Sequence, residues 1–588
     1  MEPFRNNCKV LALIHRLTPG RIALQILERC ASLAYGSFYS LLLFRFLIDA
    51  LEHSAPLSNV AGFLLLFVGA GLAVDLFKAW FHNLYRPKSD QWITKALTDL
   101  LQEKAKSADL TSYENPEYYD RYTLAAEQAV KQSLLLVETV AMMCGVIFAL
   151  FLNAGFVLFV DPSTLLLSAI PITLSFFFER QRSERTYRME CEAVPHRRRA
   201  EYVRRTVYLA EYAKELRITT IFSVLKRNFS EAMQQLQKNV KRHGVWIALY
   251  RFIAEFALQV LLFLSLYGYI VWRYLAKNAF PLGDFASLSG AIINFAGFVE
   301  DLAGGYNDFH RIGGYVGDLL HFLEKEPAIR DGAEDFCFRR TIEFRSVGFT
   351  YPGQKQPALQ DVSFTIQRGE RIAIVGFNGA GKSTLVKLLL RLYEPQCGEI
   401  LVDGRPLTAF RLNSLRSEIV CAPQDFHLYS ATVANNVLMR PAGPEDEECV
   451  RNALKAVGLE IDDPMHTLLT KEFSEEGLNL SGGQSQKLAV ARIFASDAPI
   501  AVLDEPSSAL DPISEAAMFQ SLLAAGKSRT ILFVSHRLSS VQAADRILVF
   551  ERAELVEDGT HQELMEQEGL YAAMWRIQAE NDRKEKCV

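Results

Sequence analysis

The sequence predicts a chain of two joined parts: an all-α transmembrane domain of six helices over residues 1–330, and an α/β domain over residues 331–588. Two observations lead to this division. The first part holds six long apolar runs, whereas the second places short apolar strands and helix-forming stretches around a glycine-rich turn. Half of all residues are hydrophobic. Because the second part is polar, the first must be strongly apolar.

Six apolar runs are long enough to cross a bilayer, which takes about 20 residues per helix. The fourth run is short and contains Pro171, where we expect a kink. Buried helices of a soluble core are the alternative interpretation, but six such runs with polar, basic spacers favour membrane spans. The expected spans cover residues 22–48, 60–84, 134–159, 164–178, 245–272 and 285–309.

The spacers indicate an orientation. Residues 86–131 and 179–243 form two long, basic spacers, and the others are short. Because basic loops stay on the cytoplasmic side, we expect both termini and the α/β domain in the cytosol of a multi-pass protein of the inner or plasma membrane. Lipid head groups explain the arginines better than nucleic acid does, so we expect no nucleic-acid partner. We expect no cleavable signal peptide.

The α/β domain opens with a phosphate-binding motif. Ile372–Val375 reads as a buried strand, and the turn after it ends in Gly-Lys-Ser-Thr before a helix-forming run. This is G-x-x-x-x-G-K-S between a strand and a helix. Lys382 can reach the β- and γ-phosphates of a nucleotide, and the Ser383 hydroxyl suits Mg²⁺. The predicted nucleotide-binding residues here are Gly376, Asn378, Gly379, Gly381, Lys382, Ser383 and Thr384.

A second motif supplies carboxylates. Four apolar residues precede Asp504 and Glu505, of which the first can hold Mg²⁺ and the second can polarise water. Between the two motifs lies Leu-Ser-Gly-Gly-Gln at residues 480–484. In this order the motifs resemble the ATP-binding cassette (ABC) family, from about Phe338 to Arg576. The resemblance implies ATP and Mg²⁺ as ligands.

The resemblance assigns the remaining roles. Tyr351 matches the aromatic residue that stacks on adenine, and Glu475 falls in an acidic loop that faces the intracellular helices. The implied catalytic residues are Glu505 as base, His536 as the γ-phosphate switch, and Gln424. The implied Mg²⁺ ligands are Ser383, Gln424 and Asp504. The residues implied to complete the site of a second cassette are Ser481, Gly482, Gly483, Gln484 and Asp511.

One membrane bundle and one cassette resemble half of an exporter of the bacterial, B-subfamily-like type. The resemblance implies an ATPase that exports an amphipathic peptide, drug or lipid-like substrate by alternating access, as a dimer of two copies. A related half-transporter as partner, an importer of siderophores or cofactors, and an ATP-gated channel or regulatory subunit are the alternatives. Ser485 replaces a basic residue usual after the signature. The nine scattered cysteines indicate free thiols.

Two further expectations concern the membrane part. Residues 113–120 and 211–217 resemble the short coupling helices of the two intracellular extensions. Charged residues inside spans are costly and mark either helix pairing or a transport path. A path lined by carboxylates would favour cationic, amphipathic cargo. The residues expected to line this substrate cavity are Glu138, Glu255, Glu300 and Asp301.

Overall fold

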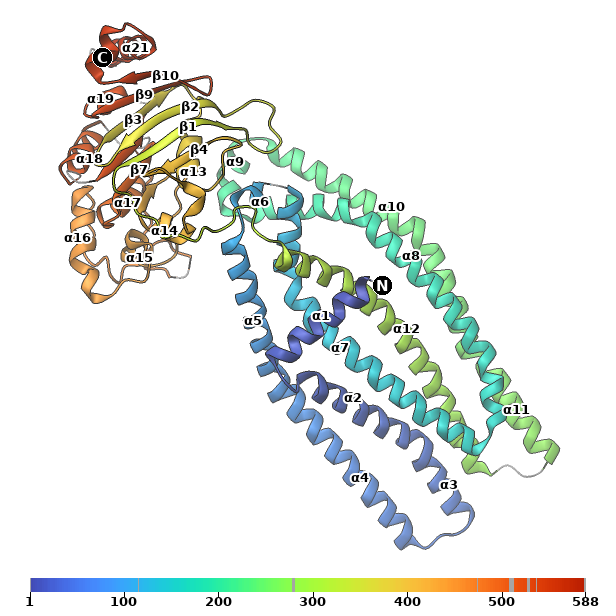
Figure 1. Cartoon of the computed structure of the whole chain (residues 1–588). Helices are drawn as coiled ribbons and strands as arrows, with labels where there is room; N and C mark the ends of the chain where they lie inside the picture. Colours follow the sequence, from blue (N-terminus) through green and yellow to red (C-terminus); the bar gives the residue numbers. More distant parts are fainter. Residues whose placement is uncertain are drawn as a thin grey trace. The chain divides into compact units, whose positions relative to one another are not determined.

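The computed structural model describes residues 2–114, 116–277, 281–472, 474–506, 512–525, 529–535 and 537–585. The chain forms two compact units (Figure 1). The helical unit comprises residues 1–107 and 116–325, and the α/β unit comprises residues 108–115 and 326–588. The α/β unit therefore includes a short piece of chain from between two long helices.

The helical unit is built from long helices joined by short turns (Figure 1). At three places a single π-helical turn joins two consecutive helices into one longer helix: α2 to α3, α4 to α5, and α10 to α11. The helices are α1 (Glu2–Leu17), α2 (Arg21–Phe38), α3 (Phe44–Glu52), α4 (Leu57–Trp80), α5 (Arg86–Ser107), α7 (Pro116–Val160), α8 (Pro162–Tyr208), α9 (Ala213–Ile218), α10 (Ile221–Phe256), α11 (Leu262–Lys277) and α12 (Leu282–Glu324).

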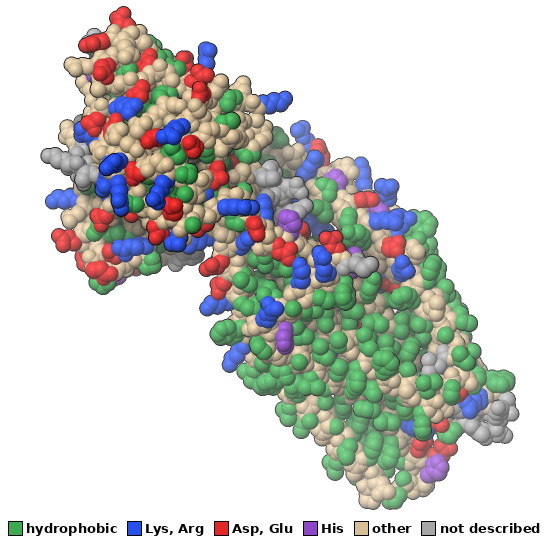
Figure 2. Space-filling model, viewed as in Figure 1, with side chains coloured by type: hydrophobic (Ala, Val, Ile, Leu, Met, Phe, Trp, Pro, Cys, Tyr) green, Lys and Arg blue, Asp and Glu red, His purple; other side chains and the backbone are tan. Residues whose placement is uncertain are grey.

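Six segments of the described chain are long and apolar enough to cross a membrane, in the order that the sequence predicts. Helix α4 is the clearest case: it is rich in leucine, and Gly71 is its only buried residue. A helix that is apolar on all sides and exposed requires an apolar solvent. Figure 2 shows the corresponding band of apolar side chains on this unit, with charged side chains beyond it. Pro171 lies inside α8, which continues as one helix to Tyr208.

Helix α12 packs against several other helices of the unit. It packs along α7 and also contacts α1 and α3, while α8 packs along α10. Val10, Ile14, Leu136 and Ile312 belong to one buried cluster near the N-terminus. At the opposite end, the Asp161 carboxylate caps α8 and accepts hydrogen bonds from Tyr269 and Arg273 of α11. The α7–α8 turn is thereby tied to α11.

The short coupling segments differ in position from the expectation. The first short helix, α6, covers Leu110–Glu114, and α7 already begins at Pro116. Proline at the first position of a helix needs no partner for its nitrogen, which explains this start. The second segment forms a 3₁₀ turn at Ala210–Tyr212 and then α9.

The α/β unit contains two sheets. The six-stranded sheet has the order β10-β9-β3-β8-β7-β6 and is parallel except for the β9–β10 pair. The four-stranded antiparallel sheet has the order β2-β1-β4-β5. The strands are β1 (Thr341–Phe349), β2 (Leu359–Gln367), β3 (Arg371–Gly376), β4 (Cys397–Val402), β5 (Arg405–Pro406), β6 (Ile419–Ala422), β7 (Ile500–Asp504), β8 (Thr530–Val534), β9 (Arg546–Glu551) and β10 (Glu554–Gly559).

Alternate residues of β3 enter two different cores. Ile372 and Ile374 pack with the four-stranded sheet, and Ala373 and Val375 pack with α16 and α17. A parallel strand covered on both faces is apolar throughout, as this one is. The helices of this unit are α6 (Leu110–Glu114), α13 (Lys382–Leu389), α14 (Leu412–Ser417), α15 (Val433–Leu438), α16 (Glu447–Ala456), α17 (Gly482–Phe494), α18 (Pro512–Ala525), α19 (Leu538–Val541), α20 (His561–Glu566) and α21 (Leu570–Glu585).

Candidate functional site

The predicted motifs meet at one edge of the six-stranded sheet. Strands β3, β8, β7 and β6 are parallel neighbours, and their pairing aligns Ile374 with Val534, and Val534 with Asp504. The glycine-rich turn follows β3, Asp504 ends β7, and Gln424 follows β6. Ligands of open parallel sheets bind at this carboxyl edge.

The glycine-rich turn wraps the Lys382 side chain. The Lys382 Nζ donates hydrogen bonds to the carbonyl oxygens of Gly376 (2.9 Å) and Phe377 (3.0 Å). Burial lowers the pKa of Lys382, while Glu505 and Asp504 act in the opposite direction. Gly381 precedes α13 with a φ of 101°, which favours glycine. The turn and the first helical N–H groups offer a place for phosphate oxygens.

Two oxygen donors lie beside this turn. The Ser383 hydroxyl donates a hydrogen bond to Asp504 Oδ1 at 3.1 Å. Burial raises the pKa of Asp504, and the Ser383 hydrogen bond partly offsets that effect. A buried carboxylate beside a hydroxyl fits Mg²⁺, which prefers oxygen ligands. Ser383, Asp504 and the Gln424 amide oxygen are the residues that would hold the ion, whose chemistry is to neutralise phosphate charge.

Glu505 is held at the rim of the site. Its Oε2 accepts a hydrogen bond of 2.9 Å from Gln424 Nε2, and its backbone carbonyl accepts one of 3.1 Å from Gln486 Nε2. The residue has a φ of 51°, in the left-handed region. A non-glycine residue pays roughly 1–3 kcal/mol for such a conformation, which surrounding contacts must offset. The two hydrogen bonds hold the backbone and the carboxylate of Glu505 in place at the site.

Tyr351 stands next to the phosphate turn. Its hydroxyl lies 3.2 Å from Thr384 Oγ1, and its ring lies 5.3 Å from Lys387 Nζ. The ring of Tyr393 packs edge-on against it. Tyr351 is half-buried, and Asn378 and Gly379 are exposed. A partly open aromatic face at this place can stack on a base.

The signature residues begin α17 with an exposed cap. Ser481 Oγ accepts a hydrogen bond from the Gln484 N–H, and Gln484 Oε1 accepts one from the Ser481 N–H. This reciprocal pair leaves Gly482 exposed and Gly483 half-buried at the helix start. Asp511 and His536 lie outside the described residues. Glu475 is exposed in the loop before the signature.

Comparison with known proteins shows what this region is similar to. The ABC transporter family matches residues 359–508. The matched segment lies within the α/β unit. It carries Lys382, Ser383, Gln424, Ser481 and Glu505, the residues whose geometry is described above.

Two curated relatives are ATP-dependent lipid A-core flippases. The one from Sodalis glossinidius is 35% identical over 347 residues, which is 59% of this chain and 59% of the relative. The one from Escherichia coli is 41% identical over 238 residues, or 40% and 41% of the two chains. The matches therefore span at most about three fifths of these relatives' lengths.

The fold is shared over nearly the whole chain with a solved structure, that of a bacterial Atm1-family ABC exporter with ATP bound. The TM-score is 0.78 at 23% sequence identity, covering 96% of this chain and all of the other. The predicted fold class, six membrane helices followed by an α/β nucleotide-binding domain, is confirmed.

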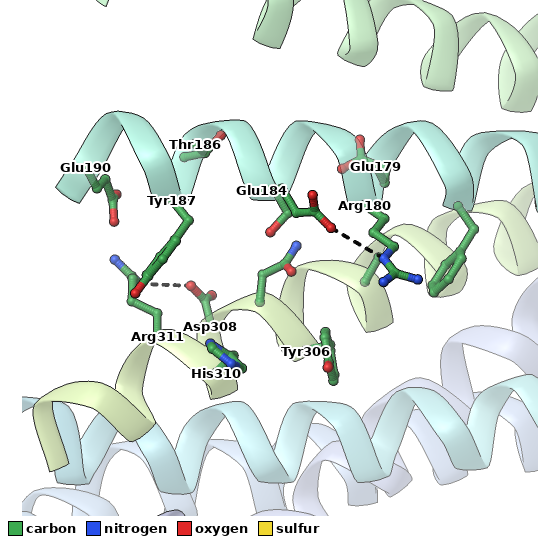
Figure 3. Close-up of a pocket in the computed structure, with 14 residues that line it drawn as sticks. Glu179, Arg180, Glu184, Thr186, Tyr187, Glu190, Tyr306, Asp308, His310 and Arg311 are labelled. Atoms are coloured by element: carbon green, nitrogen blue, oxygen red, sulfur yellow. Dashed lines mark hydrogen bonds and ion pairs between the residues drawn. The ribbon is translucent and has the colours of Figure 1, made fainter. Parts of the chain in front are cut away.

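The helical unit contains a cavity of about 610 Å³ between α8 and α12. Figure 3 shows side chains of the two helices pointing toward each other across it. Its wall carries charges of both signs in pairs: Arg180 with Glu184 on α8 (3.6 Å) and Arg311 with Asp308 on α12 (2.8 Å). Its polar wall can hold water and polar groups.

A second cavity of about 330 Å³ adjoins α8, α10, α11 and α12. It receives two of the four carboxylates expected to line a substrate path, Glu255 and Glu300. Glu138 instead pairs with Arg86 (3.1 Å) and Arg29 (3.7 Å) on neighbouring helices. Neither Glu138 nor Asp301 lines either of these two cavities.

The structure adds residues that the sequence did not single out. Glu179 lines both cavities, although it follows the apolar run 164–178 and the sequence predicts it to begin the polar spacer. Ser175, inside that run, is 1% exposed and also faces the second cavity. In the α/β unit, Tyr393 donates a hydrogen bond of 2.5 Å to Glu114 of α6. Its position before Glu-Pro gave no signal for this contact.

Proposed function

We propose that this chain is one half of an ATP-driven exporter that works as a dimer in the bacterial inner membrane, with both termini in the cytosol. One arrangement carries the proposal: Lys382, Ser383–Asp504 and Gln424–Glu505 lie at a single sheet edge. In the same chain, six segments can cross a bilayer. The likeness to an ABC exporter over nearly the whole chain supports the direction of transport.

The proposed chemistry is hydrolysis of the γ-phosphate. Phosphoryl transfer needs mainly positioning and charge neutralisation. The loop N–H groups and Lys382 would bind the phosphates, Lys382 exchanging its carbonyl partners for phosphate oxygens. Glu505 would take a proton from the attacking water, and Gln424 holds its carboxylate in place. His536 would contact the γ-phosphate.

The dimer follows from the place of the signature. Ser481 and Gly482 are exposed at the start of α17, next to the half-buried Gly483, and the Ser481 hydroxyl accepts its hydrogen bond from Gln484 of the same helix. We propose that this helix start closes over nucleotide bound to the partner cassette, together with Asp511. A second copy is the proposed partner, and a related half-transporter is the alternative.

The proposed substrate is an amphipathic molecule, lipid-like or a peptide or drug, taken from the bilayer. The flippase names of two relatives favour a lipid-like substrate. An importer on this fold and an ATP-gated channel are the competing functions. The candidate catalytic base Glu505 argues against a gated channel, since gating alone requires no fast ATP hydrolysis.

ATPase and transport assays in nanodiscs and proteoliposomes test the proposal. The purified chain should hydrolyse ATP alone, elute as a dimer, and lose turnover in Glu505→Gln. Wild-type protein that binds ATP without hydrolysing it would refute the proposed activity. Uptake into vesicles whose cassettes face inward would indicate import.

A further inference from the structure

The second cavity of the helical unit combines an acidic end with an apolar wall. Glu179 of α8, Glu255 of α10 and Glu300 of α12 enter it from three helices. Its wall contains no lysine, arginine or histidine, and the rest of it is mostly apolar. The apolar residues include Leu262, Phe263, Tyr267, Ile292 and Ile293.

The three carboxylates differ in their partners. Glu179 accepts a hydrogen bond from Arg182 on its own helix, at 2.6 Å. Glu255 pairs with Arg251, also on its own helix, at 2.7 Å. Glu300 has no ion pair within 4 Å among the described residues and is exposed to the cavity. Arg251 also acts electrostatically on Glu300 from a longer distance, so Glu300 is the carboxylate of the lining without a direct ion pair among the described residues.

A serine hydroxyl lies beside the carboxylates in the cavity wall. Ser175 lies one helical turn before Glu179, is 1% exposed and lines the cavity. Its hydroxyl adds a neutral polar group to the acidic end of the lining. A hydroxyl can both donate and accept, so an occupant with a polar group would find a hydrogen-bond partner here. This observation is independent of the carboxylates.

The two ends of the cavity differ in chemical character. Ile293 precedes Glu300 by seven residues on α12, or about 10 Å at the helical rise. Helix α12 begins near the α7–α8 turn, which Asp161 ties to α11. The apolar wall thus lies toward that turn and the carboxylates toward the opposite end, which the proposed orientation places at the cytosolic leaflet. Glu179 also borders the larger polar cavity, which continues from the acidic end.

We infer that this cavity binds the cargo of the proposed exporter, and that the cargo carries a cationic head group, an ammonium or guanidinium, on an apolar body. The inference rests on the proposed function and names its substrate class. The head group would donate hydrogen bonds to Glu300, Glu179 and the Ser175 hydroxyl, and the body would contact Phe263, Tyr267 and Ile293. A phosphate head group would face three carboxylates in a site of low dielectric and be repelled.

A single metal ion is a poorer occupant. The described residues contain no group of three or more histidine, cysteine or acidic side chains arranged to hold one. The carboxylates thus surround a volume instead of converging on a point. An organic cation with several N–H donors fits such a distribution.

Three probes with one alkyl chain test the head group: dodecylamine, dodecanol and dodecyl phosphate. Binding to the full-length dimer in nanodiscs is measured with each probe, alongside empty nanodiscs. Wild type should bind dodecylamine at least tenfold more tightly than the other two. Glu300→Gln should lose about tenfold of that affinity, the size of one charge-assisted hydrogen bond. The matched control Asp301→Asn, whose side chain lines neither cavity, should keep it.

ATP binding separates the possible failures, because it reports on the other unit. If Glu300→Gln no longer binds ATP or elutes as aggregate, Glu255→Gln and Ser175→Ala take its place and should each lower dodecylamine affinity. Equal affinity for the three probes, preference for dodecyl phosphate, or equal losses in Glu300→Gln and Asp301→Asn would overturn the inference. If any of these results is found while the wild type still hydrolyses ATP, only the inference about the cargo fails. If the wild type does not hydrolyse ATP, the proposed function itself is refuted.

Discussion

Gly381→Ala should disrupt the phosphate turn far more than the same change two residues earlier. Both Gly381 and Gly379 have positive φ, of 101° and 80°. A Cβ at Gly379 would meet no atom within 4 Å, whereas a Cβ at Gly381 would overlap the Ala358 carbonyl oxygen and lie 2.6 Å from Leu359 Cδ2. The Ala358 N–H is bonded to the Phe349 carbonyl, so this backbone is held in place.

The two costs can be separated. Alanine in the left-handed region costs roughly 1–2 kcal/mol, and both variants carry that term. Overpacking against fixed backbone adds about 1–3 kcal/mol, and only Gly381→Ala carries it. For a unit of this size, 1 kcal/mol shifts the melting temperature by about 2–4 °C. Gly379→Ala should therefore melt about 2–8 °C below wild type, and Gly381→Ala roughly 2–12 °C lower again.

Differential scanning fluorimetry of the nucleotide-free protein in detergent gives the melting temperatures. Equilibrium binding of a fluorescent ATP analogue gives the second readout. If the overlap distorts the conformation in which the turn binds phosphate, Gly381→Ala should also lower the affinity for ATP. The loss relative to Gly379→Ala should be roughly 5- to 150-fold. Equal melting temperatures and equal affinities for the two variants would refute the assignment of the Gly381 contact.

The remaining predictions concern turnover, assembly and coupling. Glu505→Gln should keep ATP affinity and lower turnover by about 10²–10⁴-fold, the usual contribution of a general base. Wild-type turnover would exclude this base. Ser481→Arg should abolish ATP hydrolysis. Mixed dimers of Ser481→Arg and Lys382→Ala chains should regain ATP binding at the one composite site that both chains leave intact. No recovery in the mixed dimers would contradict assembly in trans. Tyr393→Phe removes the hydrogen bond to Glu114 but keeps the ring, so stimulation of ATP hydrolysis by dodecylamine should fall while basal hydrolysis persists. Unchanged stimulation shows that this bond does not couple the units.

Local sequence was sufficient for the parts that depend on neighbours along the chain. Bilayer length and apolar content are properties of one segment, so the six spans could be placed in order. The phosphate turn is equally local, because its glycines, Lys382 and the following helix are contiguous. The family resemblance then placed Gln424 and Glu505, which the sheet brings together although they lie 81 residues apart.

Only the tertiary structure decided which charges inside the membrane part meet. Glu138 and Glu300 look alike in sequence, since each is a carboxylate within an apolar run. Folding places Arg86 and Arg29 beside Glu138, whereas Glu300 faces a cavity together with Glu179 and Ser175. The reason is physical: the cost of a charge in a bilayer depends on the partner that a distant helix presents, and that partner is set by helix packing.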